Sequence, residues 1–283
     1  FTYLKTGEKS LEKSHHATRG NIHIGNVSAS YELDSLNLLT ASTSLFGYKV
    51  GNTIISNYER WDKNNHLLYQ YDESTTIPHY SYFKIGGRLD YQHKTHLDGE
   101  VLTLSYMLAA TRNRKTNHIE LSNLVNAPFN YTACDLHSHE RFTEHTFQLD
   151  YVHPFGKQHK LESGLKYILR NNNSHTRTDY TGSMPNEDKE FKHNTQVAAA
   201  YLSYLFTAGN WSARAGLRYE YSYMKADFPD GSGTGFHANL HDWVPSASVQ
   251  YKITDAQTIK FSYSTSINRP GIKYLNPAVV RTP

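Results

Sequence analysis

Residues 211–223 read Trp-Ser-Ala-Arg-Ala-Gly-Leu-Arg-Tyr-Glu-Tyr-Ser-Tyr. Every second residue from Trp211 to Tyr223 is apolar or aromatic, and the positions between carry serine, arginine, glycine and glutamate. Successive side chains of a β-strand point to opposite faces of a sheet, so this stretch predicts a strand with one apolar and one polar side. Residues 83–91, 161–170 and 259–267 repeat the alternation. The chain is therefore predicted to be all-β.

The composition excludes several other classes of protein. The 283 residues include 22 Tyr, 12 Phe and 3 Trp, which are too many aromatic residues for a disordered chain of net charge +3. Basic and acidic residues are nearly balanced, 29 against 26, which argues against a nucleic-acid-binding protein. A single cysteine excludes an internal disulfide framework. No apolar run approaches the roughly 18 residues that a membrane-spanning helix needs.

Short and long connections alternate along the chain. Short turns are expected near residues 34–35, 94–99, 154–157, 208–210 and 254–257, and long polar segments at 48–78, 112–141, 171–194 and 226–240. This alternation predicts an antiparallel up-and-down sheet with short turns at one rim and long loops at the other. Outer-membrane β-barrels show this asymmetry, whereas long loops are uncommon in compact soluble domains. We count about twelve strands of a larger barrel, including one at residues 1–5.

A tyrosine stands three to five residues before each short turn, at Tyr31, Tyr91, Tyr151, Tyr204 and Tyr251. Tyrosine has an apolar ring and a polar tip, and it is enriched where hydrocarbon meets lipid headgroups. The recurrence predicts an aromatic girdle at one edge of a membrane-spanning band. The alternative is cross-strand aromatic packing in a soluble sheet.

The two faces of the strands supply further predictions. Charged residues occupy the polar face at Lys84, Arg88, Asp90, Glu162, Lys166, Arg170, Arg214, Arg218 and Glu220. In a barrel they would line a wet lumen, and in a two-layer soluble protein they would face solvent. Their mixed signs do not indicate a pore selective for one type of ion. The residues predicted to face lipid are Phe147, Leu149, Leu217, Tyr219, Phe261 and Tyr263.

Residues with catalytic or metal-binding chemistry are sparse. Cys134, His137 and His139 lie within six residues of one another, and a thiolate with two imidazoles could hold zinc or copper. His137 and His139 would share a face if they lay on a strand. No nucleophile elbow, zinc-protease motif or phosphate-binding loop is present. We therefore expect neither an enzyme nor a cofactor.

The segment Phe261-Ser-Tyr-Ser-Thr-Ser-Ile-Asn-Arg-Pro-Gly-Ile-Lys-Tyr-Leu-Asn-Pro-Ala-Val makes the prediction more specific. It resembles a stretch in the barrel of TonB-dependent outer-membrane receptors, in the form found in the outer-membrane β-barrel family of Bacteroidetes. The matching positions are Arg269, Pro270, Leu275, Asn276 and Pro277. The resemblance implies a large barrel, with a plug domain folded inside it, that imports a scarce nutrient using energy passed from the inner membrane.

Together these observations predict that residues 1–283 are part of a single outer-membrane β-barrel domain, with the plug domain, signal peptide and terminal strands not present. The expected function is nutrient binding and uptake across the bacterial outer membrane. Expected partners are outer-membrane lipid, the TonB complex acting through the absent plug, and a surface lipoprotein; no nucleic acid is expected. Two alternatives are a structural or adhesive barrel without energised transport and a soluble all-β carbohydrate-binding protein.

Overall fold

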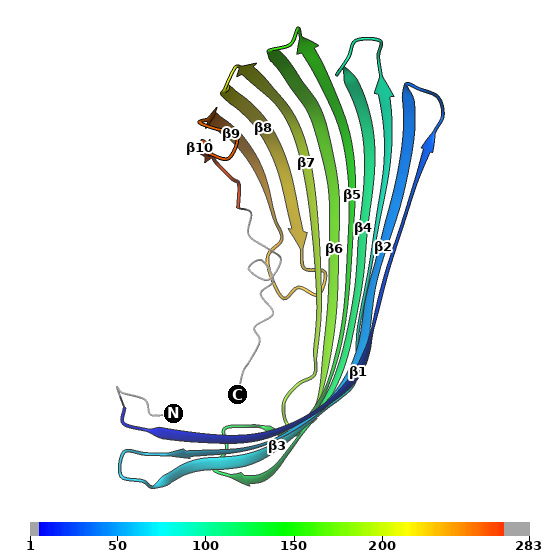
Figure 1. Cartoon of the computed structure of the whole chain (residues 1–283). Helices are drawn as coiled ribbons and strands as arrows, with labels where there is room; N and C mark the ends of the chain where they lie inside the picture. The colour runs from blue at the N-terminus through cyan, green and yellow to red at the C-terminus, as the bar shows by residue number, and fades with distance from the viewer. Residues whose placement is uncertain (1–5, 269–283) are drawn as a thin grey trace.

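The computed structural model describes residues 6–268 as one antiparallel sheet whose ten strands follow one another in chain order (Figure 1). The strands are β1 (Lys9–Glu32), β2 (Asn37–Trp61), β3 (Leu67–Lys94), β4 (Val101–Val125), β5 (Tyr131–Phe155), β6 (His159–Gly182), β7 (Glu187–Ala208), β8 (Trp211–Asp227), β9 (Phe236–Lys252) and β10 (Thr258–Ser264). Each strand pairs with its sequence neighbours, and among the described residues no pairing between β1 and β10 closes the sheet. No helix in this part of the chain is long and apolar enough to cross a membrane.

The connections alternate between two rims, as the sequence predicts. The turns at residues 33–36, 95–100, 156–158, 209–210 and 253–257 lie at one rim, which we call the turn rim. The connections at 62–66, 126–130, 183–186 and 228–235 lie at the other, which we call the hairpin rim. Asn210 and Gly231 accordingly lie at opposite ends of β8. The prediction of an all-β, antiparallel up-and-down architecture is confirmed.

The polar segments at the hairpin rim are longer strands, not the loops that the sequence suggested. β2 continues to Trp61 and β3 begins at Leu67, so most of residues 48–78 is paired backbone. Strands β1 to β7 have 22 to 28 residues, whereas about 9–11 suffice to cross a bilayer. A change from apolar to polar side chains ends the lipid-facing region, but it does not end backbone pairing. The described residues form ten strands where we counted about twelve, and the strand expected at residues 1–5 lies outside them.

A bulge in β3 lies beyond the apolar band, on the side of the hairpin rim. The register between β3 and β4 shifts between Thr76 and His79, on either side of Pro78. Proline cannot donate to the ladder, and a bulge increases the bend and twist of a strand. The lower parts of β1 and β3 bend sharply away from the rest of the sheet in Figure 1.

The two faces of the sheet differ completely in burial. Every buried residue lies on one face, and examples are Ser105, Thr146, Glu220 and Ala226. Since side chains converge on the inside of a curved sheet and spread apart on the outside, this is the concave face. The other, convex face carries the exposed apolar side chains. The curvature therefore separates a crowded polar interior from an apolar exterior.

The convex face carries a continuous apolar band near the turn rim. On β4 it runs from Leu102 to Ala110, nine residues, which matches the length that a barrel strand needs to cross a bilayer. Its members on other strands include Phe83, Leu89, Phe147, Leu149, Leu165, Leu202 and Leu217, which are 37–56% exposed. Five of the six residues predicted to face lipid are exposed on this face, and Tyr219 is half-buried there. None lies in a closed core between two sheets.

Candidate functional site on the concave face

All nine charged residues singled out from the sequence lie on the concave face. The register joins them in rows across the sheet: Asp90 of β3 lies in the row of Ser105, Gln148, Lys166 and Glu220. The remaining members lie on the same face because they are separated from this row by even numbers of residues on β3, β6 and β8. The concave face is thus charged over the same height at which the convex face is apolar.

Most of these charged side chains form ion pairs with a side chain of opposite charge on the same face. Arg88 donates from Nε to Asp90 Oδ2 at 2.6 Å, and Arg170 donates from Nε to Glu144 Oε2 at 2.7 Å. Two further ion pairs are Arg214 with Glu162 and Arg218 with Glu220. Lys84 and Lys166 have no ion pair among the described residues. Two of these pairs lie within one strand, on β3 and on β8, one joins the neighbouring strands β5 and β6, and one joins β6 to β8. The face therefore carries charges of both signs without a strong excess of either.

A tyrosine crosses the centre of this network because a glycine leaves room for it. Tyr201 of β7 extends over Gly164 of β6, and its hydroxyl donates to Asp150 of β5. A Cβ at Gly164 would lie 2.3 Å from the Tyr201 ring. Gln148 Nε2 donates to Asp150 Oδ2 at 2.8 Å, and the Arg218 guanidinium lies 5.8 Å from the Tyr201 ring centroid. The site therefore offers a guanidinium from β8, an amide from β5 and a phenol from β7.

The sequence did not identify Glu144, Gln148, Asp150 and Tyr201 as members of this site. Each is polar or aromatic at an inward position of an alternating strand, which was the available signal. Only the register between strands shows which of them meet the predicted charges. The register between two strands decides which residue of the neighbouring strand lies opposite a given side chain. Alternation along one strand does not predict that register.

The five tyrosines before the short turns all lie on the convex face. Their hydroxyls point toward the turn rim where partners exist: Tyr91 donates to Asn37 Oδ1 at 2.6 Å, and the Tyr204 hydroxyl lies 2.5 Å from His159 Nδ1. The Tyr151 hydroxyl donates to Glu100 in the turn at 95–100. Rings in the band with hydroxyls at its edge are the arrangement expected of an aromatic girdle.

A second row of convex-face tyrosines, missed in the sequence, points the opposite way. The Tyr106 hydroxyl lies 2.9 Å from His145 Nδ1, and the Tyr219 hydroxyl lies 2.7 Å from His241 Nδ1. Tyr167 donates to Gln196 at 2.9 Å, and Tyr221 donates to Asn239 at 2.8 Å. In each pair the polar partner is on the neighbouring strand, one step nearer the hairpin rim. The apolar band is thus bounded by tyrosine hydroxyls on both sides.

The carboxylate of Glu100 is held strongly at the turn rim. Hydrogen bonds from Thr95, Tyr151 and His153 lower the pKa of Glu100 from 4.5 to about 2. His153 Nδ1 lies 2.6 Å from Glu100 Oε1. The turn at 95–100 is therefore tied to the end of β5 by a carboxylate that stays ionised.

The structure separates the three residues considered for a metal. Cys134, His137 and His139 all lie on β5, but Cys134 is buried on the concave face and the two histidines are on the convex face. Residues three or five apart on one strand point to opposite sides. No group of three His, Cys, Asp or Glu side chains among residues 6–268 could hold a metal ion. The expectation that these three residues converge is wrong, because the segment is a strand.

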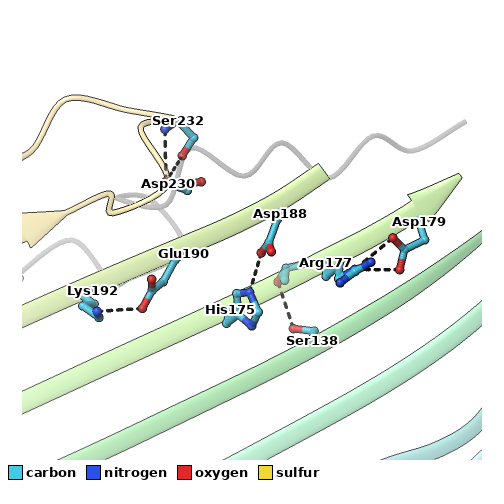
Figure 2. A network of polar contacts seen from close by, with 10 residues as sticks. Ser138, His175, Arg177, Asp179, Asp188, Glu190, Lys192, Asp230 and Ser232 are labelled. Atoms are coloured by element: carbon cyan, nitrogen blue, oxygen red, sulfur yellow. Dashed lines mark hydrogen bonds and ion pairs between the residues drawn. The ribbon is translucent and has the colours of Figure 1, made fainter. Parts of the chain in front are cut away.

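Beyond the apolar band, the hairpin of β6 and β7 carries ion pairs on its convex face (Figure 2). His175 Nε2 lies 2.5 Å from Asp188 Oδ1, Arg177 Nε lies 2.9 Å from Asp179 Oδ2, and Lys192 Nζ lies 2.8 Å from Glu190 Oε1. The convex face is polar in this part of the sheet, as expected for a hairpin that stands in water. The motif residues Arg269, Pro270, Leu275, Asn276 and Pro277 lie outside the described residues.

A single curved sheet with an apolar convex band, two rows of tyrosines and a charged concave face defines a transmembrane β-barrel wall. The model of the Outer membrane protein beta-barrel family matches residues 93–282, and the chain belongs to that family. It is an outer-membrane protein, and the soluble alternative is wrong. The expectation that it is not an enzyme agrees with this family. No curated protein sequence matches the chain.

Solved structures of outer-membrane receptors share the fold. The ferric-catecholate import receptor Fiu of E. coli, in its open form, aligns with a TM-score of 0.53 and 9% identity over 95% of this chain and 56% of its own. The siderophore receptor PiuA of Acinetobacter baumannii aligns with a TM-score of 0.50 and 12% identity over 90% of this chain and 49% of its own. This chain spans about half the length of these receptors.

Proposed function

We propose that the chain forms part of the barrel wall of a TonB-dependent receptor that binds a nutrient and takes part in its uptake across the outer membrane. The observation that carries the proposal is the concave face, where paired charges, an amide and a phenol line the inside of a wall whose outside is apolar. Charged, amide and phenol groups at the height of the apolar band can contact a polar solute inside the barrel, and a barrel formed only for structure does not need such groups in that place.

The proposal includes the parts that lie beyond this sequence. The ten strands are part of one larger barrel domain, and a plug domain elsewhere in the protein occupies its interior and contacts the TonB complex. A surface lipoprotein is a further proposed partner at the hairpin rim. The fold of Fiu and PiuA supports this assignment; Fiu is a ferric-catecholate import receptor and PiuA is a siderophore receptor.

Nutrient limitation tests the transport function in the full-length protein. The parent strain, a deletion strain and the complemented deletion strain would be grown with iron, cobalamin or a complex glycan as the single limiting nutrient. The proposal expects slower growth of the deletion strain on one of these, and uptake that stops when an uncoupler removes the proton-motive force. Equal growth on all three, or uptake insensitive to the uncoupler, would favour a non-energised structural or adhesive barrel.

Cysteine accessibility tests the assignment of the nine charged residues to the lumen. Phe83 and Lys84 are adjacent on β3, both are exposed, and they lie on the convex and concave faces respectively. In a Cys134→Ser background of the full-length protein, Lys84→Cys should react with a small water-soluble thiosulfonate and Phe83→Cys should not. Reaction of Phe83→Cys in preference to Lys84→Cys would overturn the assignment.

A further inference from the structure

The convex face changes abruptly at the upper edge of the apolar band on β4 and β5. Ala110 is the last apolar position of the band on β4, and the next two convex-face residues are Arg112 and Arg114. On β5 the convex-face residues at this height are His139 and Arg141. We call these four residues the basic cluster. The three arginines are exposed and the histidine is half-buried.

The strand register packs the basic cluster into one small area. Arg112 is directly opposite Arg141, and Arg114 is directly opposite His139. Side chains directly opposite each other in an antiparallel pair have Cβ atoms about 4.5–5.5 Å apart, and like charges in such positions are destabilising. The four residues therefore form the corners of a rectangle roughly 5 Å by 7 Å.

No carboxylate in the described part of the chain compensates this charge. The neighbours of the basic cluster on the same face are Ser81 and Phe83 of β3 and Asn173 and His175 of β6. Of the ten arginines between residues 6 and 268, six form an ion pair with a carboxylate. The other four are Arg19 and the three of the basic cluster.

The surroundings of His139 show the excess of positive charge. Burial and the charges of Arg141, Arg114 and Arg112 lower the pKa of His139. Arg141 donates from Nε to His139 Nε2 at 3.4 Å. The cluster holds three guanidinium groups and an imidazole.

The depth of the cluster identifies the anion that it fits. It lies at the edge of the lipid-facing band toward the hairpin rim, where strands β1 to β7 continue as polar hairpins beyond the band. Barrels of this type place their longer polar extensions outside the cell and their short turns in the periplasm. Lipid headgroups of the outer leaflet lie at this height, and their phosphates are held in a plane beside the barrel wall. Guanidinium groups bind phosphate oxygens through two parallel hydrogen bonds.

We propose that the basic cluster binds the phosphate groups of an outer-leaflet glycolipid whose acyl chains lie against the apolar band beneath it. The bound phosphate offsets the repulsion between Arg112 and Arg141. The site faces lipid, so it is separate from the concave face and does not depend on the transported nutrient. It rests on the outer-membrane location and on the hairpin rim being external.

Lipid retention by the full-length protein tests the site. The protein would be purified from phosphatidylcholine vesicles containing one part in ten of diphosphorylated lipid A, and bound lipid counted by native mass spectrometry. The triple variant Arg112→Gln, Arg114→Gln, Arg141→Gln should retain lipid A at least about tenfold less than the wild-type protein, since each surface cation contributes measurably to binding anionic lipid. Equal retention by the triple variant would refute the proposal.

A charge-matched control separates the site from general electrostatic attraction. Arg177, Lys192 and Lys225 lie on the same convex face, and each is paired with a carboxylate; Figure 2 shows the first two pairs. Their triple substitution by glutamine also removes three positive charges and should change retention less than twofold. An equal loss in this control would refute a specific site. Complete displacement of lipid A by millimolar inorganic phosphate would also refute it, in favour of a site for free anions.

A stability measurement keeps the test independent of how well the variant folds. Lipid A in phosphatidylcholine vesicles should raise the urea midpoint of the wild-type protein and leave that of the cluster variant unchanged. In pure phosphatidylcholine the cluster variant should be at least as stable as the wild type, because it lacks the like-charge pair. No change in the wild-type midpoint on adding lipid A would contradict the proposal.

Discussion

Replacing Leu217 by arginine tests the assignment of the convex face to lipid. Leu217 is 47% exposed on this face and lies opposite Leu202 and Pro245. Tyr219 lies two residues nearer the hairpin rim, and its hydroxyl marks one edge of the band. Ala215 lies two residues nearer the turn rim, opposite Tyr204, which belongs to the row of tyrosines before the short turns. The side chain is therefore near the middle of the band.

An arginine at the midplane of a barrel's lipid face costs about 2–4 kcal/mol. This corresponds to a factor of roughly 30 to 900 in the folding equilibrium. The assay is urea unfolding of the full-length protein in phosphatidylcholine vesicles, followed by tryptophan fluorescence. Leu217→Arg should lower the free energy of unfolding by that amount and slow insertion into vesicles.

The matched control places the same side chain on the other face at the same height. Ser246 is exposed on the concave face of β9 and lies opposite Gly216, the residue before Leu217. Ser246→Arg should cost less than about 1 kcal/mol, because its guanidinium can remain in water, as at most exposed positions. If the two variants lose the same stability, or if Leu217→Arg loses less than about 1 kcal/mol, the convex face does not contact lipid.

Three further predictions concern particular side chains. Because its pKa is lowered to about 2, ionised Glu100 stabilises the fold fully above its ordinary pKa of 4.5 and loses this effect as the pH falls toward 2; Glu100→Gln should flatten that part of a pH series of urea midpoints. Gly164→Ala should cost about 1–3 kcal/mol by displacing the Tyr201 ring, and little in a Tyr201→Ala background; equal costs in both backgrounds would show that the ring is not the obstacle. His193 is 7% exposed on the concave face, and neither ring nitrogen has a hydrogen-bond partner among the described residues, so His193→Phe should raise the free energy of unfolding by about 1 kcal/mol; a loss of stability would reveal a bound water or ligand there.

The alternation in residues such as Trp211 to Tyr223 was enough to predict the fold class and the content of both faces. Side-chain direction in a strand depends only on position along the chain, so Lys84 and Phe83 could be assigned to opposite faces without any tertiary information. The tyrosines before the turns were also predictable, because a turn and the strand leading into it are local in sequence.

The paired strands at the hairpin rim were not predictable in the same way. Residues 112–118 and 137–141 are polar on both sides, and such a segment has no hydrophobic pattern to distinguish a strand from a loop. Pairing with a neighbouring strand satisfies their backbone groups and keeps them extended. The same extension places Cys134 away from His137 and His139, which a flexible loop could have brought together.

Register and curvature belong to the tertiary structure alone. The contacts of Tyr201 with Asp150, of Tyr106 with His145 and of Arg112 with Arg141 join residues 29 to 51 positions apart in the chain. A shift of one residue in pairing would turn every one of these side chains to the other face. The sequence by itself determined which side chains share a face of each strand. The pairing of the strands and the bend of the sheet decided which of them touch and which face is enclosed, because those depend on contacts between strands and not on order within one.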